Sequence, residues 1–273
     1  MRKAIIVVLV LLITASLGFT AGQEETDGKG GYRIALSNDY AGNSWRQTMI
    51  KDWEKAAAAA IEKGIVSEAS VFTTNESSAA EQAAQIQNLI LEGYDAIVLN
   101  AASPTALNGA VRQALDAGIV VVSFDNAITE ERAWRLITDF EYMGAAQVEY
   151  VADRFDSADI LEIRGLAGTY VNDAIHEGIM GALKSYPDLE VIGEVYGNWT
   201  QSVAQREVAG ILPSIDNVDA VITQGGDGYG AVKAFEAAGR EVPLVIMGNR
   251  YDEMSLWKEM KENRGYETMS ISI

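Results

Sequence analysis

A polar loop follows the first apolar run of the chain, and its side chains could hydrogen-bond the hydroxyl groups of a small ligand. Residues 32–36 have the composition of a buried strand, residues 37–44 form the loop, and a helix is expected from about residue 45. The candidate ligand residues here are Asn38, Asn43, Trp45 and Arg46. In open α/β sheets, ligand sites lie beyond the carboxyl ends of strands. We therefore expect a ligand site at this loop, although an ordinary strand–helix turn with an Asx cap has similar residues.

Polar residues recur where later apolar segments end. The further candidates of this kind are Asp125 and Asn126 after residues 119–124, Gln224 and Asp227 after residues 220–223, and Asn249 after residues 244–247. Each of them alone could simply cap a helix or solvate a loop. Because the carboxyl ends of parallel strands meet at one edge of a sheet, the set as a whole favours a binding site.

Short apolar segments alternate with helical segments along the chain. The expected strands are 32–36, 68–73, 95–100, 119–124, 134–138, 160–164, 190–196, 220–223, 244–247 and 268–273. The expected helices are 45–63, 79–92, 104–117, 141–154, 171–186, 201–212, 229–238 and 252–262. Ser78 and Glu81 have the spacing of a capping box, and Ser103 before Pro104 predicts an N-cap with proline at the first helical position. Near-continuous apolar strands are typical of parallel sheets covered by helices, so the sequence predicts two βα arrays that meet near Asp139.

The composition limits the class of partner. The chain has 273 residues, a formal net charge of −18 and no cysteine. The excess of acidic residues argues against nucleic acids and anionic membrane surfaces as partners. Without disulfides, the fold must obtain its stability from a hydrophobic core, and the chain is long enough to form one.

The first 22 residues have the pattern of a secretory signal peptide. A basic start is followed by apolar residues 4–12 and then by small residues up to Ala21 and Gly22, where cleavage is expected. A membrane anchor is the alternative, but the apolar run is short for a span. Residues 23–31 are expected to be a flexible leader. The protein is therefore expected in the periplasm or otherwise outside the cytoplasm.

Several motifs in a fixed order indicate a family. They are Ser-Asn-Asp-Tyr-Ala-Gly-Asn-Ser-Trp at 37–45, Ala-Ile-Val-Leu-Asn at 96–100, Val-Val-Val-Ser-Phe-Asp at 120–125, Arg-Gly-Leu-Ala-Gly-Thr at 164–169, Gln-Gly-Gly-Asp at 224–227 and Val-Ile-Met-Gly-Asn at 245–249. Together they resemble the ribose-binding-like (type I) periplasmic sugar-binding proteins of ABC importers. The resemblance implies two Rossmann-like lobes, residues 32–138 and 139–273, each a parallel sheet flanked by helices. A hinge near Asp139 would join them.

The resemblance also assigns roles to individual residues. It places an amide and an aromatic ring of the first lobe at Asn43 and Trp45, the carboxylate that takes two sugar hydroxyls at Asp125, an aromatic ring of the second lobe at Trp199, and polar groups at Gln224 and Asn249. The sequence departs from the family at two places. Asn126 stands where many members have arginine, and residues 170–176 lack the arginine that many members have there. Asn172, Asp173 and His176 are the candidates in that stretch, with a packing or surface role as the alternative for His176, and the identity of the sugar stays open.

Members of the family that the sequence resembles have further elements after the position of Ile273, the last residue of this sequence. The resemblance therefore implies that the first lobe is incomplete without its C-terminal elements and exposes apolar surface. The sequence is accordingly expected to be a fragment or a truncated reading frame.

The predicted function is capture of a monosaccharide or similar small polar ligand between two lobes, and its delivery to an ABC permease. Trp45 and Trp199 would cover the C–H-rich faces of the sugar, whereas Trp53, Trp134 and Trp257 are expected to be core or interface rings. The protein is expected to be a monomer without cofactor or metal.

Four alternatives remain open from the sequence. An enzyme is disfavoured because the chain has no Gly-x-Ser-x-Gly motif, no cysteine and one histidine, although Asp125 and Asp227 could together do acid–base work. The glycine-rich segment 225–230 lacks the Gly-Lys-Ser/Thr of a P-loop.

A transcriptional regulator would need a DNA-binding module in place of the signal peptide. A sensor that passes its ligand to a chemoreceptor or kinase, or a polyol, nucleoside or furanosyl ligand, would fit the same sequence.

Overall fold

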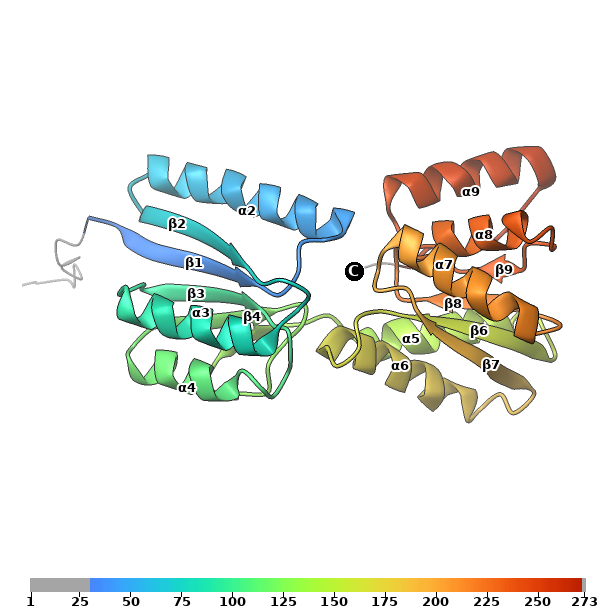
Figure 1. Cartoon of the computed structure of the whole chain (residues 1–273), viewed down its shortest axis with the longest axis horizontal. Coiled ribbons are helices and arrows are strands. Elements are labelled where there is room, and N and C mark those ends of the chain that lie inside the picture. Colours follow the sequence, from blue (N-terminus) through green and yellow to red (C-terminus); the bar gives the residue numbers. More distant parts are fainter. Residues whose placement is uncertain (1–29, 272–273) are drawn as a thin grey trace, which may run out of the picture. The chain divides into compact units, whose positions relative to one another are not determined.

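The computed structural model describes residues 30–271 (Figure 1). The predicted signal peptide, most of the predicted leader and the last two residues of the chain lie outside the described residues.

The first sheet is parallel throughout and has the strand order β2-β1-β3-β4-β5. Its strands are β1 (Tyr32–Asn38), β2 (Val66–Thr73), β3 (Ala96–Asn100), β4 (Val120–Phe124) and β5 (Trp134–Leu136). Its helices are α2 (Ser44–Glu62), α3 (Ala79–Leu91) and α4 (Asn108–Asp116). Because β1 and β4 lie on either side of β3 and run parallel, the loops after them leave the same carboxyl edge of the sheet.

The second sheet is also parallel, with the order β7-β6-β8-β9. Its strands are β6 (Ala158–Arg164), β7 (Leu189–Tyr196), β8 (Ala220–Thr223) and β9 (Leu244–Val245). Its helices are α5 (Phe140–Ala152), α6 (Tyr170–Leu183), α7 (Gln201–Ile211), α8 (Gly228–Ala237) and α9 (Tyr251–Arg264), with a short 3-10 helix at Leu212–Ser214. One core joins α5 and α6 to one face of this sheet, and another joins α7, α8 and α9 to the other face (Figure 1). The predicted α/β fold of two parallel sheets flanked by helices is confirmed.

The two faces of the first sheet are covered unequally. Ala35, Ile97, Leu99 and Val121 are buried against α3 and α4. On the other face, the 19-residue helix α2 buries only Arg46 and Ala57. Val120, Trp134 and Leu136 are 48%, 73% and 72% exposed. We call these three residues the apolar β5 surface. Within the part of the chain that the structure describes, Trp134 is therefore not a core ring, and the interface role stays a prediction.

Helix starts follow their capping signals only in part. Ser78 Oγ accepts the backbone N–H of Glu81 at 3.3 Å, as the capping box predicts. The Glu81 carboxylate instead accepts the N–H of Asn75, so the reciprocal bond of the box is not made to Ser78. Ser103 Oγ accepts the N–H of Ala106 in a turn, and α4 begins only at Asn108. The predicted start of that helix after Ser103 is wrong, because the side chain of Ser103 caps a separate turn.

The strand expected at 244–247 is shorter than predicted, and the strand expected at 268–273 is reduced to a single bridge within the described residues. β9 contains only Leu244 and Val245, and Met247 pairs with Ser270 as an isolated parallel bridge. The Met247 N–H donates to Met269 O at 3.0 Å, and the Ile271 N–H donates to Met247 O at 2.8 Å. The segment 268–271 thus lies alongside the end of β9 without forming a full strand, and residues 272–273 lie outside the described range.

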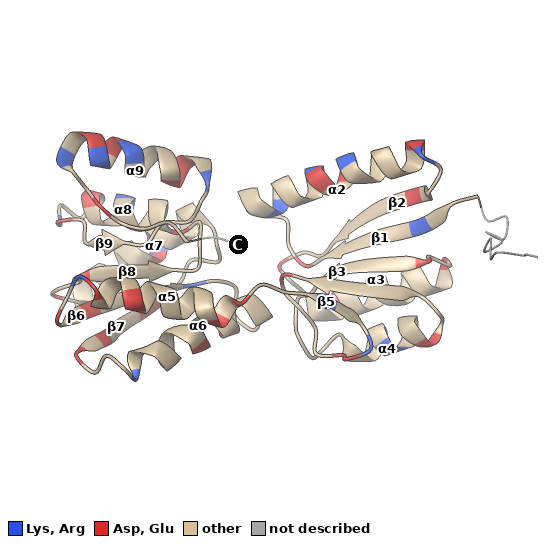
Figure 2. Cartoon of the chain, turned by 180° about the vertical axis from the view of Figure 1, so that it is seen from behind, with Lys and Arg blue, Asp and Glu red and all other residues tan. Residues whose placement is uncertain are grey.

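Charges on α9 follow the helix dipole. Asp252 and Glu253 lie in its first turn, and Lys261 and Arg264 lie in its last turn (Figure 2). Gly265 ends the helix in the left-handed conformation, with φ of 66°. Among residues 30–271, no helix combines the length and apolar character needed to cross a membrane.

Candidate functional site

A pocket is lined by residues that follow strands of both sheets. It is open to solvent, and the empty space within it, solvent-exposed parts included, is about 570 Å³. The first array contributes Asn43, Trp45, Arg46 and Asp125, and the second contributes Phe140, Met143, Val171, Ile175, Trp199, Gln224, Gly225, Gly226, Gly248, Asn249, Arg250 and Ile271. Seven of the twelve predicted ligand residues line this pocket, namely Asn43, Trp45, Arg46, Asp125, Trp199, Gln224 and Asn249.

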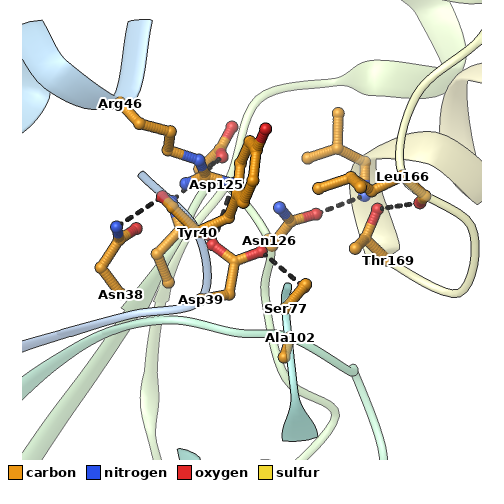
Figure 3. A network of polar contacts seen from close by, with 12 residues as sticks. Asn38, Asp39, Tyr40, Arg46, Ser77, Ala102, Asp125, Asn126, Leu166 and Thr169 are labelled. Atoms are coloured by element: carbon orange, nitrogen blue, oxygen red, sulfur yellow. Dashed lines mark hydrogen bonds and ion pairs between the residues drawn. The ribbon is translucent and has the colours of Figure 1, made fainter. Parts of the chain in front are cut away.

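Arg46 lies at the centre of the polar network around β1 and β4. Asn43 is the N-cap of α2, and its Oδ1 accepts the Arg46 N–H at 2.9 Å. The Arg46 guanidinium is 2% exposed and lies 3.1 Å from Asp39 Oδ1 and 3.3 Å from Asp125 Oδ2 (Figure 3). Two carboxylates therefore surround one buried cation, which fixes the position of the arginine head.

The environment shifts the pKa values of both carboxyl groups in this network. Burial raises the pKa of Asp39 to about 6, while Arg46 and the Ser77 hydroxyl oppose the rise. Burial also raises the pKa of Asp125, and Arg46 again opposes it. Both carboxyl groups therefore become protonated at a higher pH than an ordinary aspartate, despite their ion pairs with Arg46.

Asp125 and Trp199 both have backbone conformations that are uncommon for residues with a side chain. Their φ angles are +55° and +52°, in the left-handed region. Strain of this kind typically costs about 1–3 kcal/mol and accumulates at functional sites. Neighbouring residues contact both side chains: Asn100 Nδ2 donates to Asp125 Oδ2 at 3.2 Å. At Trp199, a Cβ on Gly165 would lie 2.2 Å from the indole ring, so only glycine fits beneath it.

The amide of Gln224 is engaged by the protein. Its Oε1 accepts the Gly165 N–H at 3.0 Å, and its Nε2 donates to Asn172 O at 3.0 Å. Gln224 therefore ties the loop after β8 to the loop after β6. It lines the pocket mainly as a positioning residue for Gly165 and Asn172.

Other predicted ligand residues lie outside the pocket lining. Asn38 is fully buried and donates from Nδ2 to Tyr40 O at 2.6 Å. Asn126 is also fully buried, and its Oδ1 accepts the Val171 N–H at 3.0 Å (Figure 3). Asn126 thus joins the end of β4 to the first turn of α6.

The α6 candidates also hold the local structure together. Asn172 Oδ1 accepts the Gly165 N–H at 3.1 Å, and its Nδ2 donates to Asp173 Oδ1 at 2.8 Å. Asp173 is exposed and lies 3.5 Å from the Arg164 guanidinium. Neither residue is brought into the pocket lining, and both contribute to the order of the β6–α6 loop.

Asp227 lies in the protein core. It is fully buried, and burial raises the pKa of its carboxyl well above its usual range, with Arg250 opposing the rise. A Cβ on Gly197 would come within 2.7 Å of Asp227 Oδ1. The structure therefore does not bring Asp125 and Asp227 together in the pocket, as acid–base catalysis by this pair would require.

Sequence reasoning did not select Arg250, although it follows directly after Asn249. Arg250 Nη1 donates to Trp199 O at 2.8 Å, and a Cβ on Gly226 would lie 2.1 Å from its Cζ. Its position after the β9 segment is a signal that could have found it. The apolar pocket residues of α5 and α6 had no such signal, because apolar positions in a helix usually indicate core.

His176 belongs to a second polar cluster, which lies apart from the pocket lining. Its Nδ1 lies 2.9 Å from the buried Glu162 carboxylate. Burial raises the pKa of Glu162, and His176 opposes the rise. Glu162, His176 and Glu194 offer three ligand atoms within 4.8 Å of one another. Arg164 lies among them, 3.2 Å from Glu194 and 4.0 Å from Glu162, so a protein cation already balances the acidic charge there.

Comparison with known proteins gives the family. The model of the periplasmic binding protein domain matches residues 34–270, which is most of the chain. The chain belongs to this family of periplasmic binding proteins. The predicted family is thus confirmed, and membership implies a location outside the cytoplasm.

Individual relatives agree with this assignment. The chain is 29% identical over 272 residues to the D-ribose/D-allose-binding protein of Pseudomonas aeruginosa. This alignment covers 95% of this chain and 82% of that protein. It is 29% identical over 180 residues to the xylitol-binding protein of Mycolicibacterium smegmatis, which covers 64% of this chain and 52% of that protein. An ABC transporter solute-binding protein from Thermobispora bispora has a similar structure, with a TM-score of 0.80 and 36% identity over 88% of this chain and 74% of that chain.

Proposed function

We propose that this chain is an extracytoplasmic solute-binding protein that captures a sugar or a similar polyol. The observation that carries the proposal is the pocket that has one tryptophan from each array, Trp45 and Trp199, together with hydrogen-bonding groups from both. Relatives that bind ribose, allose and xylitol support this ligand class.

The pocket has the chemistry that a polyhydroxylated ligand needs. Indole rings cover C–H-rich surfaces, and charged groups form stronger hydrogen bonds with hydroxyls than neutral groups do. Asp125 and Arg46 offer a carboxylate and a guanidinium side by side, and Asn249 is exposed at the pocket. A ligand held by both arrays would stabilise their closed arrangement about a hinge near Asp139, with residues 32–138 and 139–273 as the two lobes.

The remaining assignments follow from this proposal. The relatives are binding proteins, and the Nδ1 of the single histidine is engaged by Glu162, so we propose no catalytic role, no metal and no cofactor. A signal peptide over residues 1–22 would be removed on export. The loaded protein would act as a monomer and deliver its ligand to an ABC permease. Delivery to a chemoreceptor or kinase is the alternative, and uptake by vesicles that contain a cognate permease would separate the two.

The first experiment is a ligand screen of the exported chain by Trp fluorescence and calorimetry, against pentoses, hexoses, polyols and nucleosides. We expect Trp45→Ala and Trp199→Ala to weaken the binding of a hit by about 10- to 100-fold, since each removes one covered face of the ligand. Trp257→Phe is the control, because Trp257 does not line the pocket. A protein that unfolds cooperatively but binds nothing in the screen would contradict the proposal.

A further inference from the structure

The part of the pocket formed by the second array is divided into an apolar and a polar half. Phe140 and Met143 lie one turn apart on α5, and Val171 and Ile175 lie one turn apart on α6. We call these four residues the apolar wall. The loops after β8 and β9 contribute Gln224, Asn249 and Arg250 to the other half.

Two backbone donors beside the apolar wall are already used. The Val171 N–H, in the first turn of α6, donates to Asn126 Oδ1 at 3.0 Å. The Gly165 N–H is shared between Asn172 Oδ1 at 3.1 Å and Gln224 Oε1 at 3.0 Å. A ligand hydroxyl placed against the wall would therefore lose water partners without gaining either of these two N–H groups as a partner.

The two helices that carry the wall are closely packed. A Cβ on Gly144 would lie 2.1 Å from Ile175 O, and a Cβ on Gly178 would lie 1.9 Å from Glu141 O. The backbones of α5 and α6 are therefore packed closely together. The wall is therefore presented by two helices whose backbones pack directly against each other.

Hydroxyl partners lie elsewhere in the pocket. Arg46 and Asp125 lie at the first array, and Asn249 and Arg250 lie at the polar half of the second. A matching ligand therefore carries hydroxyls on the edges that face these groups and none on the edge that faces the wall. We propose that the ligand is a deoxy sugar, whose methyl or methylene group packs against Phe140, Met143, Val171 and Ile175. This inference rests on the proposed sugar-binding function.

Calorimetry with sugar pairs that differ by one hydroxyl tests the inference. The pairs are L-fucose with L-galactose, L-rhamnose with L-mannose, and 6-deoxy-D-glucose with D-glucose. We expect the deoxy member of at least one pair to bind 10-fold or more tightly than its parent, since an unpaired buried hydroxyl costs about that factor or more. Parents that bind as well as or better than every deoxy sugar would overturn the inference and leave the proposed function intact. Binding of other polyols alone, such as xylitol, would also overturn the inference and leave the proposed function intact. A lack of binding by every sugar and polyol would overturn both the inference and the proposed function.

Substitutions in the wall test it independently. Val171→Thr keeps the side-chain shape but adds a hydroxyl, so we expect the preference for the deoxy member to fall several-fold. Val151→Thr is the control, because Val151 is buried in the same core but does not line the pocket. Met143→Gln is a second wall variant in case Val171→Thr does not fold. An unchanged preference in the folded wall variants would overturn the inference.

Discussion

Arg46 connects the stability of the pocket to its charge. Its guanidinium is almost fully buried and lies between Asp39 and Asp125. The arginine favours the charged form of each carboxyl, but burial has the larger effect on both and raises their pKa values. A buried pair of this kind contributes less to stability than its short distances suggest. It does hold the guanidinium at the lining of the pocket.

Asp39 gives a pH-dependent prediction. Its pKa is about 6 in the folded protein and about 3.9 in an unfolded chain, so the folded state binds the proton more tightly. The stability that Asp39 contributes is therefore present below about pH 4 and is lost as the pH rises through 6. The free energy of unfolding of Asp39→Asn, relative to that of the wild type, should therefore increase by roughly 2–3 kcal/mol from pH 4 to pH 7.5. Urea unfolding at both pH values measures this, with the exposed Asp52→Asn as control. A stability difference that does not change with pH would contradict the prediction.

The strained backbone of Asp125 gives a second prediction. Glycine adopts a φ of +55° without strain, whereas alanine does not. Asp125→Gly should therefore be more stable than Asp125→Ala by about 1 kcal/mol, although both variants lose ligand affinity. Denaturant unfolding of the two variants tests this directly. Equal stabilities would mean that the loop relaxes out of the left-handed conformation once the carboxylate is removed.

For single residues, the sequence predicted the pocket residues that follow strands, but it did not predict which hydrogen bonds the side chains make. Asp125, Asn249 and Trp45 were expected because polar and aromatic residues at strand ends converge. Nothing in the sequence indicated that the Asn126 amide would bind the Val171 N–H, or that Gln224 would be engaged by Gly165 and Asn172. Those contacts depend on the spacing between loops, which a linear pattern does not contain.

Close packing of two helices is the main feature at the scale of elements. α5 and α6 approach each other at Gly144 and Gly178, where a side chain would overlap a backbone oxygen. Both glycines are buried. Gly181 on the same helix α6 is exposed, and a methyl group added there would meet no atom within 4 Å. The apolar wall of the pocket therefore depends on this crossing.

We expect Gly144→Ala and Gly178→Ala each to destabilise the protein by about 2 kcal/mol or more, because the added methyl group forces α5 and α6 apart. Gly181→Ala should instead stabilise it by about 0.5–1 kcal/mol, since alanine is the better helix former. Equilibrium unfolding in urea measures all three. A loss of stability in Gly181→Ala equal to that of the other two would show that the crossing is not what makes Gly144 and Gly178 sensitive.

Element boundaries were predictable where a single local signal acts. The apolar runs at β1, β3 and β8 and the Ser78 cap of α3 gave the correct elements. The start of α4 was misplaced, because Ser103 makes the bond expected of an N-cap but does so in a separate turn. The end of the chain was also misjudged, because a strand needs a partner over several residues, and residues 268–271 pair only at one bridge.

Across the whole molecule, buried carboxyl groups set the pH dependence of folding. Burial raises the pKa values of Asp39, Asp125, Glu162, Asp227 and Glu253. Hydrogen bonds from Arg33 and Arg132 lower those of Glu68 and Glu130, which lie in more exposed pairs. A raised carboxyl pKa gives stability that is lost as the pH rises, so the larger group of buried acids should dominate. The net charge of −18 acts in the same direction, because self-repulsion increases with pH.

The ligand-free protein should therefore have a higher Tm at pH 5 than at pH 7.5, by several degrees. A change of about 1 kcal/mol shifts the Tm of a domain of this size by roughly 2–4 °C. Scanning calorimetry at the two pH values, at constant ionic strength, provides the measurement. A Tm that rises toward pH 7.5 would contradict the prediction, because the lowered pKa values of Glu68 and Glu130 add almost no further stability above pH 5.

The apolar β5 surface has a practical consequence for work with this protein in solution. Trp134, Leu136 and Val120 are exposed together with Ile137 in the folded state. Fluorogenic dyes that respond to apolar surface should therefore bind the native protein and give a high initial signal, which would mask unfolding in a dye-based melt. Hydrophobic-interaction resins should retain the protein at moderate salt for the same reason. Label-free light scattering and intrinsic emission are the better optical reports, with Trp134 as a water-exposed background to the emission of the other four tryptophans.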